Sequence, residues 1–417
     1  MSENVQKTLR DSAALRWLAL ILLAGAMFCS YIFMDILSPI KDLMWDTKGW
    51  DSTAFGTMQG SETFLNVFVF FLIFAGIILD KMGVRFTAIL SGAVMLVGAS
   101  INWYALTDMF AGSNLEVWFN EHLNYIPGFD ELGVSPFYKG MPASAKFSAI
   151  GFMIFGCGVE MAGITVSRGI VKWFKGREMA LAMGSEMALA RLGVATCMIF
   201  SPMFARLGGE VSVSRSVAFG VVLLMVALIM FIVYAFMDKK LDSQTGEAEE
   251  KDDPFKLSDL GKILTDSGFW LVALLCVLYY SAIFPFQKYA VNMLQCNLVF
   301  HQVDPSSIWA SNTITIIQYV IMLVVAACAF ASNFSKNKVA KYGLMGAAIV
   351  ALVVFCYMGY MRQSAETVFA VFPLLAVGIT PILGNYVDHK GKAATMLVLG
   401  SLLLIACHLT FAFVLPA

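Results

Sequence analysis

A few ionisable side chains lie inside long apolar segments of the sequence, where a charge is costly to hold and therefore marks a candidate functional site. Glu160 stands in the middle of one such segment, and Glu186 and Arg191 stand in the next. An arginine can hold a carboxylate through two parallel hydrogen bonds, and a carboxylate can hold an ammonium group. These residues predict a cavity that binds a zwitterion. The alternative is that Glu160 and Arg191 neutralise each other and only hold two helices together.

Other polar side chains are predicted to share this cavity. Tyr31 lies one turn before Asp35 near the end of the first apolar segment, and Lys288 lies near the end of a segment in the second half. Asp35 and Lys288 can act as gate residues or as anchors that extend to the membrane surface. The full set of predicted substrate-binding residues is Glu160, Arg191, Asp35, Tyr31, Tyr279, Tyr280, Asn66, Lys288 and Glu186.

The composition indicates that membrane-spanning helices position these residues. Of the 417 residues, 59% are hydrophobic and 14% are charged, and the mean hydropathy is +0.76. Soluble chains carry about 25% charged residues, so this chain needs lipid as its solvent. The net charge of -1 gives a nucleic-acid partner no electrostatic support. We predict an all-α polytopic protein with eleven crossings, near 13–38, 54–79, 84–107, 145–170, 179–205, 214–237, 267–290, 308–331, 342–361, 367–387 and 393–415.

Polar segments divide and orient these crossings. The linker-like stretch 238–266 separates an expected N-terminal six-helix bundle, residues 1–237, from a C-terminal bundle, residues 267–417. Basic residues recur in alternate loops, whereas the loop 108–144 is mainly acidic. The positive-inside rule therefore places the N-terminus and the linker in the cytoplasm.

One loop pattern occurs twice at the expected cytoplasmic surface. The stretches "GIILDKMGVRF" (Gly76–Phe86) and "GNYVDHKGK" (Gly384–Lys392) share Gly-x-x-x-Asp-x-x-Gly followed by a cation. Two copies in corresponding loops indicate a duplicated membrane protein, which is typical of transporters. Glycines allow two helix ends to approach closely, and an aspartate can cap the following helix. The predicted gating motif consists of Gly76, Asp80, Gly83, Arg85, Gly384, Asp388 and Gly391.

This pair of loops resembles the signature of the major facilitator superfamily. Within it, the stretches "CSYIFMD" (Cys29–Asp35), "CVLYYSAIFPF" (Cys276–Phe286) and "ACHLTFAF" (Ala406–Phe413) are similar to the lysosomal dipeptide transporter family. The resemblance implies two pseudo-symmetric helical bundles and uniport of dipeptides by alternating access. It also implies an accessory membrane subunit as a partner. The family has the same residue types at Glu160, Arg191, Asp35, Tyr279, Tyr280 and Asn66, whereas Glu186 replaces a glutamine that is usual in animal members.

Two features depart from the twelve-helix plan of that superfamily. The sequence similar to its eighth helix is split around an added hairpin at about 327–378, whose crossing at 342–361 is expected at the edge of the bundle. The last three helices of the plan have no counterpart, so the C-terminal bundle is expected to be incomplete.

The expected function is secondary active or facilitative transport of small solutes, most directly dipeptides or amino-acid-like solutes. The alternatives are proton-coupled transport of another organic anion or a drug, and a membrane scaffold that does not transport or a truncated transporter. We predict no enzyme activity and neither cofactor nor metal, because the sequence lacks a metal-ligand spacing, a Ser–His pair and a phosphate-binding glycine loop. The N-terminal tail lacks the acidic dileucine signal of animal members, so a cell membrane, or the inner membrane of a bacterium, is expected.

The topology can be tested by labelling. Single cysteines at Asp80 and Asp388 should react with an impermeant thiol reagent only from the cytoplasmic side, because both carry the duplicated loop motif. The measurement is labelling of intact cells compared with inside-out vesicles. Labelling of either cysteine in intact cells would contradict the predicted orientation.

Overall fold

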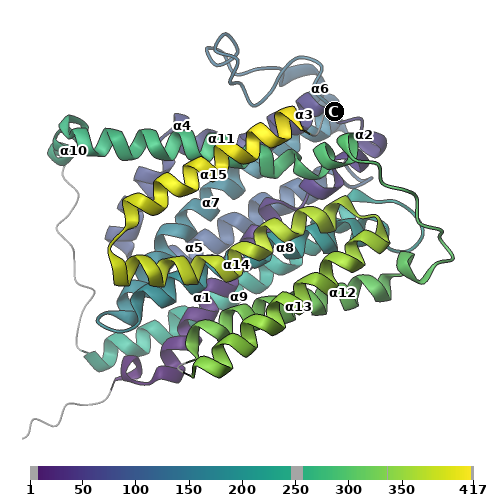
Figure 1. Cartoon of the computed structure of the whole chain (residues 1–417). Coiled ribbons are helices and arrows are strands. Elements are labelled where there is room, and N and C mark those ends of the chain that lie inside the picture. The colour runs from purple at the N-terminus through teal and green to yellow at the C-terminus, as the bar shows by residue number, and fades with distance from the viewer. Residues whose placement is uncertain (1–7, 246–256, 336, 415–417) are drawn as a thin grey trace, which may run out of the picture.

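The computed structural model describes residues 8–245, 257–335 and 337–414, and all regular elements within these ranges are helices. Nine helices of the described residues are long and apolar enough to cross a membrane. Figure 1 shows these long helices lying side by side. The prediction of an all-α polytopic protein is therefore confirmed.

The elements of the first half begin with one helical turn and end with α9, the helix that leads into the linker. They are η1 (Leu9–Asp11), α1 (Ala13–Met34), η2 (Ser38–Ile40), α2 (Lys41–Lys48), α3 (Ser52–Gly60), η3 (Ser61–Thr63), α4 (Phe64–Phe68), α5 (Phe71–Ala105), α6 (Asn114–His122), α7 (Ala143–Phe174), α8 (Met179–Ala205) and α9 (Val213–Thr245).

Among the residues that the structure describes, the second half contains fewer helical elements than the first. They are α10 (Leu257–Thr265), α11 (Ser267–Asn297), η4 (Ile308–Ala310), α12 (Asn312–Phe334), α13 (Lys338–Arg362), α14 (Ala365–Lys390) and α15 (Ala393–Phe413). The predicted hairpin at 327–378 therefore comprises the end of α12, all of α13 and the start of α14. Its status as an insertion stays a prediction.

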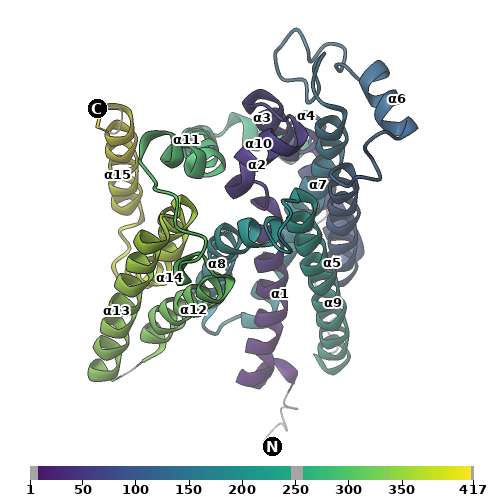
Figure 2. The same ribbon diagram turned by 90° about the vertical axis from the view of Figure 1, so that its right-hand side faces the viewer.

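The helix bundle has two ends, which we call the N-face and the loop face (Figure 2). The N-face carries residues 9–12 and the turn at Gly83, and the loop face carries α2, α3 and the segment 106–142 with α6. Helix α8 runs from the N-face, where Arg177 binds Asp11 at 2.8 Å, to the loop face at Ala205.

Glycine and alanine let the helices of the first half approach closely. A Cβ on Gly98 of α5 would collide with the backbone of Gly151 and Phe155 on α7, and a Cβ on Gly151 would collide with α5. Gly193 of α8 likewise faces the Phe28 carbonyl of α1. Such small residues permit dispersion contacts between backbones, which drive helix association where lipid removes the hydrophobic effect.

The segment predicted as one crossing over 54–79 is not a single helix. It is divided into α3, η3 and α4, and α5 begins only after Phe70, whose φ is 55°. Ser61 Oγ donates to the Ala149 carbonyl at 3.0 Å, and Asn66 Nδ2 donates to the Gly156 carbonyl at 3.3 Å. Both side chains thus bind the backbone of α7, and Ser61 Oγ also donates locally to the Met58 carbonyl at 2.6 Å, a kind of bond that competes with regular helical hydrogen bonding.

The turn of the first motif copy is built on Gly83. Helix α5 consists of two helices that meet there, because Gly83 has φ 78° and ψ 168°. Asp80 accepts from Arg168 of α7 at 2.5 Å, and Arg85 donates to Asp242 of α9 at 2.8 Å. Asp80 thus links two helices in addition to any capping role. A Cβ at Gly76 would meet no atom within 4 Å.

The second motif copy lies between α14 and α15. Gly391 has a φ of 63°, so both copies place their last glycine in a backbone conformation that L-residues rarely adopt. The surroundings of Gly384 and the side chain of Asp388 lie outside what the structure describes. The assignment of the motif to gating stays a prediction.

The second half contacts the first mainly through one helix pair. Helix α14 packs along α8, and α12 packs on α13 and α14. Helix α13 lies at the outer edge (Figure 2), where it buries only Ala348, Phe355, Met358 and Gly359 among its residues. Helix α15 meets α11 where His408 Nε2 lies 3.2 Å from the Ala282 carbonyl and Phe286 packs on Phe411.

The close approach at Gly156 can be tested with a matched pair of variants. A Cβ on Gly156 would collide with the backbone of Glu62, whereas a Cβ on Gly163 of the same helix would meet nothing within 4 Å. Gly156→Ala should lose about 1–3 kcal/mol of stability through overpacking. Gly163→Ala should gain up to about 1 kcal/mol from helix propensity. The measurement is the thermal unfolding midpoint in detergent, and similar shifts for both variants would contradict the packing argument.

Candidate functional site

A buried ion pair joins the two halves of the chain near the loop face. Lys288 of α11 contacts Asp35, the residue that ends α1, at 2.8 Å. The neighbouring Gln287 donates from Nε2 to the other carboxylate oxygen of Asp35 at 2.5 Å. Asp35 is fully buried, and Gln287 and Lys288 are 2% and 9% exposed. We call these three residues the latch.

Lys288 of the latch also caps the C-terminus of α1. Lys288 Nζ donates to the carbonyl of Met34, the last residue of α1, at 2.7 Å. A cation at a helix C-terminus meets the negative end of the helix dipole and satisfies a carbonyl that the helix leaves unpaired. Glu62 of η3 lies 3.9 Å from the same ammonium. Lys288 is therefore surrounded by acceptors that compensate for its burial.

Further contacts join α11 to the first half around the latch. Asn292 donates to Asp42 at 2.8 Å and accepts from Lys41 at 3.3 Å, and Tyr289 donates to the Ser52 carbonyl at 3.1 Å. In contrast, Tyr279 and Tyr280, nearer the N-face, are 42% and 49% exposed. The two halves are therefore held together at the loop face of α11 and separated further along it.

The charged residues predicted for the centre gather around Tyr31. The charges of Arg191, Glu186 and Glu160 all act on the Tyr31 hydroxyl, so α1, α7 and α8 bring these groups into one neighbourhood. Glu186 is buried, and Glu160 and Arg191 are partly exposed. In the described part of the chain, Glu160 and Arg191 form no ion pair with each other. Glu62 lies within electrostatic range of both Glu160 and Lys288 and so connects the latch to this centre.

The predicted site residues thus fall into three sets. Asp35 and Lys288 form the latch, whereas Tyr31, Glu160, Glu186 and Arg191 share the central neighbourhood. Asn66 bonds to the backbone of α7. Tyr279 and Tyr280 lie on the exposed part of α11, where Tyr280 stacks on Phe284 at 5.1 Å. A role of any of them in substrate binding stays a prediction.

Sequence reasoning missed two members of this arrangement. Glu62 lies inside an expected apolar crossing, so its charge was a usable signal. Gln287 is adjacent to Lys288, but a single glutamine gives no signal of its partner on α1.

Comparison with known proteins decides the family. The model of the Major Facilitator Superfamily matches residues 23–365. The chain belongs to the major facilitator superfamily. It is accordingly a multi-pass integral membrane protein of a transporter family.

Curated relatives are similar at modest identity. The lysosomal dipeptide transporter MFSD1 of Danio rerio is 30% identical over 145 residues, which are 33% of this chain and 31% of that protein. The lysosomal dipeptide transporter MFSD1 of Homo sapiens is 24% identical over 280 residues, or 65% of this chain and 52% of that protein. The chain thus spans about a third to a half of the length of the curated relatives that it matches.

Solved structures that match include two transporters. A bacterial homologue of the human drug peptide transporters PepT1 and PepT2 is 13% identical to this chain, with a TM-score of 0.45. The match covers 94% of this chain and 99% of that chain. The xylose transporter XylE from E. coli is 10% identical to this chain, with a TM-score of 0.42. The match covers 89% of this chain and 98% of that chain.

The latch can be tested by a double-mutant cycle. Lys288→Met leaves Asp35 buried without its cation and should lower stability by about 3–5 kcal/mol. Adding Asp35→Asn should restore part of the loss, because the carboxylate in contact with the lost ammonium is then neutral and only Glu62, 3.9 Å from that ammonium, is left without the cation. The measurement is the thermal unfolding midpoint of each variant in detergent.

Lys48→Met serves as the control for this cycle. Lys48 also lies at the loop face, but its partner Asp108 is fully exposed and 3.8 Å away, so the midpoint should barely change. Additive effects of Lys288→Met and Asp35→Asn would show that the two residues are not coupled.

Proposed function

We propose that this protein transports small zwitterionic solutes by alternating access, with dipeptides or amino-acid-like solutes as the substrate class. The observation that carries the proposal is that Arg191 and Glu160 share one neighbourhood around Tyr31 without an ion pair between them. An arginine and a glutamate that are partly exposed and not satisfied by each other can hold opposite charges of one ligand.

The roles follow from the charges. Arg191 would bind the substrate carboxylate with its planar guanidinium, and Glu160 would accept from the substrate ammonium. Glu186, which is buried and within electrostatic range of Arg191, would hold the guanidinium in place when no substrate is bound. Tyr31 would add a hydroxyl that can donate or accept.

The latch would provide the gate on the loop face. Its hydrogen bonds and ion pair join α1 to α11, so in this conformation these two helices are held together near the loop face. Alternating access would require Lys288 to leave Asp35 and the end of α1 while the N-face closes. The duplicated motif with Gly83 and Gly391 at its turns would govern the movement at the opposite end.

Similarity supports the substrate class but covers only part of each relative. The relatives are called lysosomal dipeptide transporters, and the matched region is about a third to a half of their length. We further propose that the N-terminus is cytoplasmic, that the protein lies in a bacterial inner membrane, and that an accessory membrane subunit accompanies it. Protease protection of an N-terminal tag and co-purification from native membranes test these three points.

Uptake by Arg191 variants tests the proposed function. Arg191→Lys keeps the charge but loses the planar fork, so a loss of roughly 2–3 kcal/mol should weaken substrate binding about thirty- to a hundred-fold. The measurement is uptake of radiolabelled dipeptide by cells at matched surface expression.

The double variant Arg191→Gln, Glu160→Gln separates binding from structure. It removes both charges of the Glu160–Arg191 set at once, so a structural pair between these two residues would tolerate it, apart from the loss of the Glu186 counter-charge. We expect uptake to be abolished while the protein remains folded. Near-normal uptake by the double variant would overturn the substrate role of both residues.

A further inference from the structure

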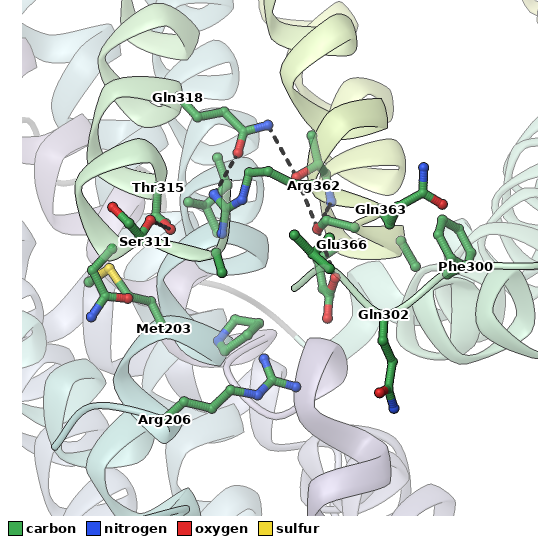
Figure 3. A pocket seen from close by; sticks show the side chains of 18 of the residues that line it. Met203, Arg206, Phe300, Gln302, Ser311, Thr315, Gln318, Arg362, Gln363 and Glu366 are labelled. Carbon is green, nitrogen blue, oxygen red and sulfur yellow. Dashed lines mark hydrogen bonds between the residues drawn. The ribbon is translucent and has the colours of Figure 1, made fainter. Parts of the chain in front are cut away.

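A polar cavity of about 1000 Å³ lies at the loop face, away from the Glu160–Arg191 neighbourhood. Its walls come from the end of α8, the segment 298–311, the start of α12 and the turn between α13 and α14 (Figure 3). Cavities that hold small ligands measure roughly 300–1000 Å³, so this space is large enough for a dipeptide.

One arginine of the cavity is held in a fixed orientation. Arg362, the last residue of α13, donates from Nη1 to Gln318 Oε1 at 2.9 Å. Gln318 is fully buried and donates from Nε2 to Thr367 Oγ1 at 3.2 Å, which sets the direction of its carbonyl oxygen. A guanidinium has five N–H donors, and Gln318 takes one of them. The remaining donors of Arg362 are available for a planar acceptor such as a carboxylate.

A second arginine faces the cavity from the opposite wall. Arg206 follows the end of α8, and Figure 3 shows its guanidinium pointing into the cavity across from Arg362 and Glu366. Among the described residues, neither Arg206 nor Arg362 has a carboxylate within 4.0 Å. Two such cations in one concave site form a receptor for a carboxylate.

Carboxylates supply the opposite charge. Glu366 accepts from Ser364 Oγ at 2.8 Å, and Asp304 accepts from the backbone and hydroxyl of Ser306 at 2.9 and 2.7 Å. The hydrogen bonds from Ser306 lower the pKa of Asp304, so this carboxyl stays ionised. The cavity therefore presents both signs of charge, as a zwitterion requires.

From this geometry we propose that the loop-face cavity is a second binding site for a small zwitterion, with the ligand carboxylate at Arg362 and Arg206 and its ammonium at Glu366 and Asp304. The ligand class rests on the proposed function, but the site does not use the central residues. Arg191 lies in α8 and Arg206 directly follows its last residue, so their 15-residue separation along a helix puts these two arginines about 22 Å apart, and the cavity wall on α8 begins at Met198.

Equilibrium binding of radiolabelled alanyl-alanine to the purified full chain tests the site. The wild type should bind two equivalents. Arg191→Gln should bind one equivalent, at the loop-face cavity. Arg362→Gln should bind one equivalent at the central site, because its affinity at the loop-face cavity should be at least tenfold weaker. The variant that carries both Arg191→Gln and Arg362→Gln should bind no alanyl-alanine. Lys139→Gln, which removes an exposed charge from the loop face outside the cavity, should bind as the wild type does.

Each contrary result has a distinct meaning. Loss of all binding in Arg191→Gln alone, or unchanged binding in Arg362→Gln, would overturn the second site. If Arg362→Gln loses binding and Arg191→Gln has no effect, the second site stands and the central site of the proposed function fails. Competition by acetate as strong as by unlabelled alanyl-alanine would show an anion site and overturn the roles of Glu366 and Asp304. Arg362→Lys should recover part of the affinity, which an unfolded Arg362→Gln protein would not explain.

Discussion

The ammonium group of Lys288 lies out of water, 2.8 Å from Asp35 and 2.7 Å from the last carbonyl of α1. A buried ammonium is tolerated only where a counter-charge and hydrogen-bond acceptors compensate for the lost solvation. This requirement determines where α11 crosses the first half and which turn of α1 it meets. The contacts of Tyr289, the adjacent residue, and of Asn292, on the next turn of the same helix, lie beside this pair.

Close helix packing supplies the frame in which this pair is held. Gly98, Gly151 and Gly193 bring backbones together within the first half, and α14 packs along α8 to attach the second half. These contacts join apolar or small residues. They keep the helices close together but do not by themselves fix one orientation of the second half relative to the first. The polar latch provides the specificity, because a misaligned ion pair would leave buried charges unpaired.

The polar groups are distributed unevenly between the two ends of the bundle. At the N-face, ion pairs such as Arg168–Asp80 and Lys172–Asp238 lie within the first half, so they stabilise that half as one body. At the loop face, the ion pair and hydrogen bonds of α11 join different halves. The halves are therefore joined in two ways, by the packing of α14 on α8 and by the polar contacts of α11 at the loop face.

The sequence by itself determined the membrane class, most crossings, the duplicated loop and the family, because apolar length, charge inside apolar segments and glycine spacing are local properties. It also indicated which charges need a partner. Only the tertiary structure decided the partners: Lys288 binds Asp35 across 253 positions of the chain, whereas Glu160 and Arg191, on consecutive long helices, do not pair. The break between α3 and α5 and the cavity around Arg362 likewise depend on backbone carbonyls and walls from distant segments, which no local pattern encodes.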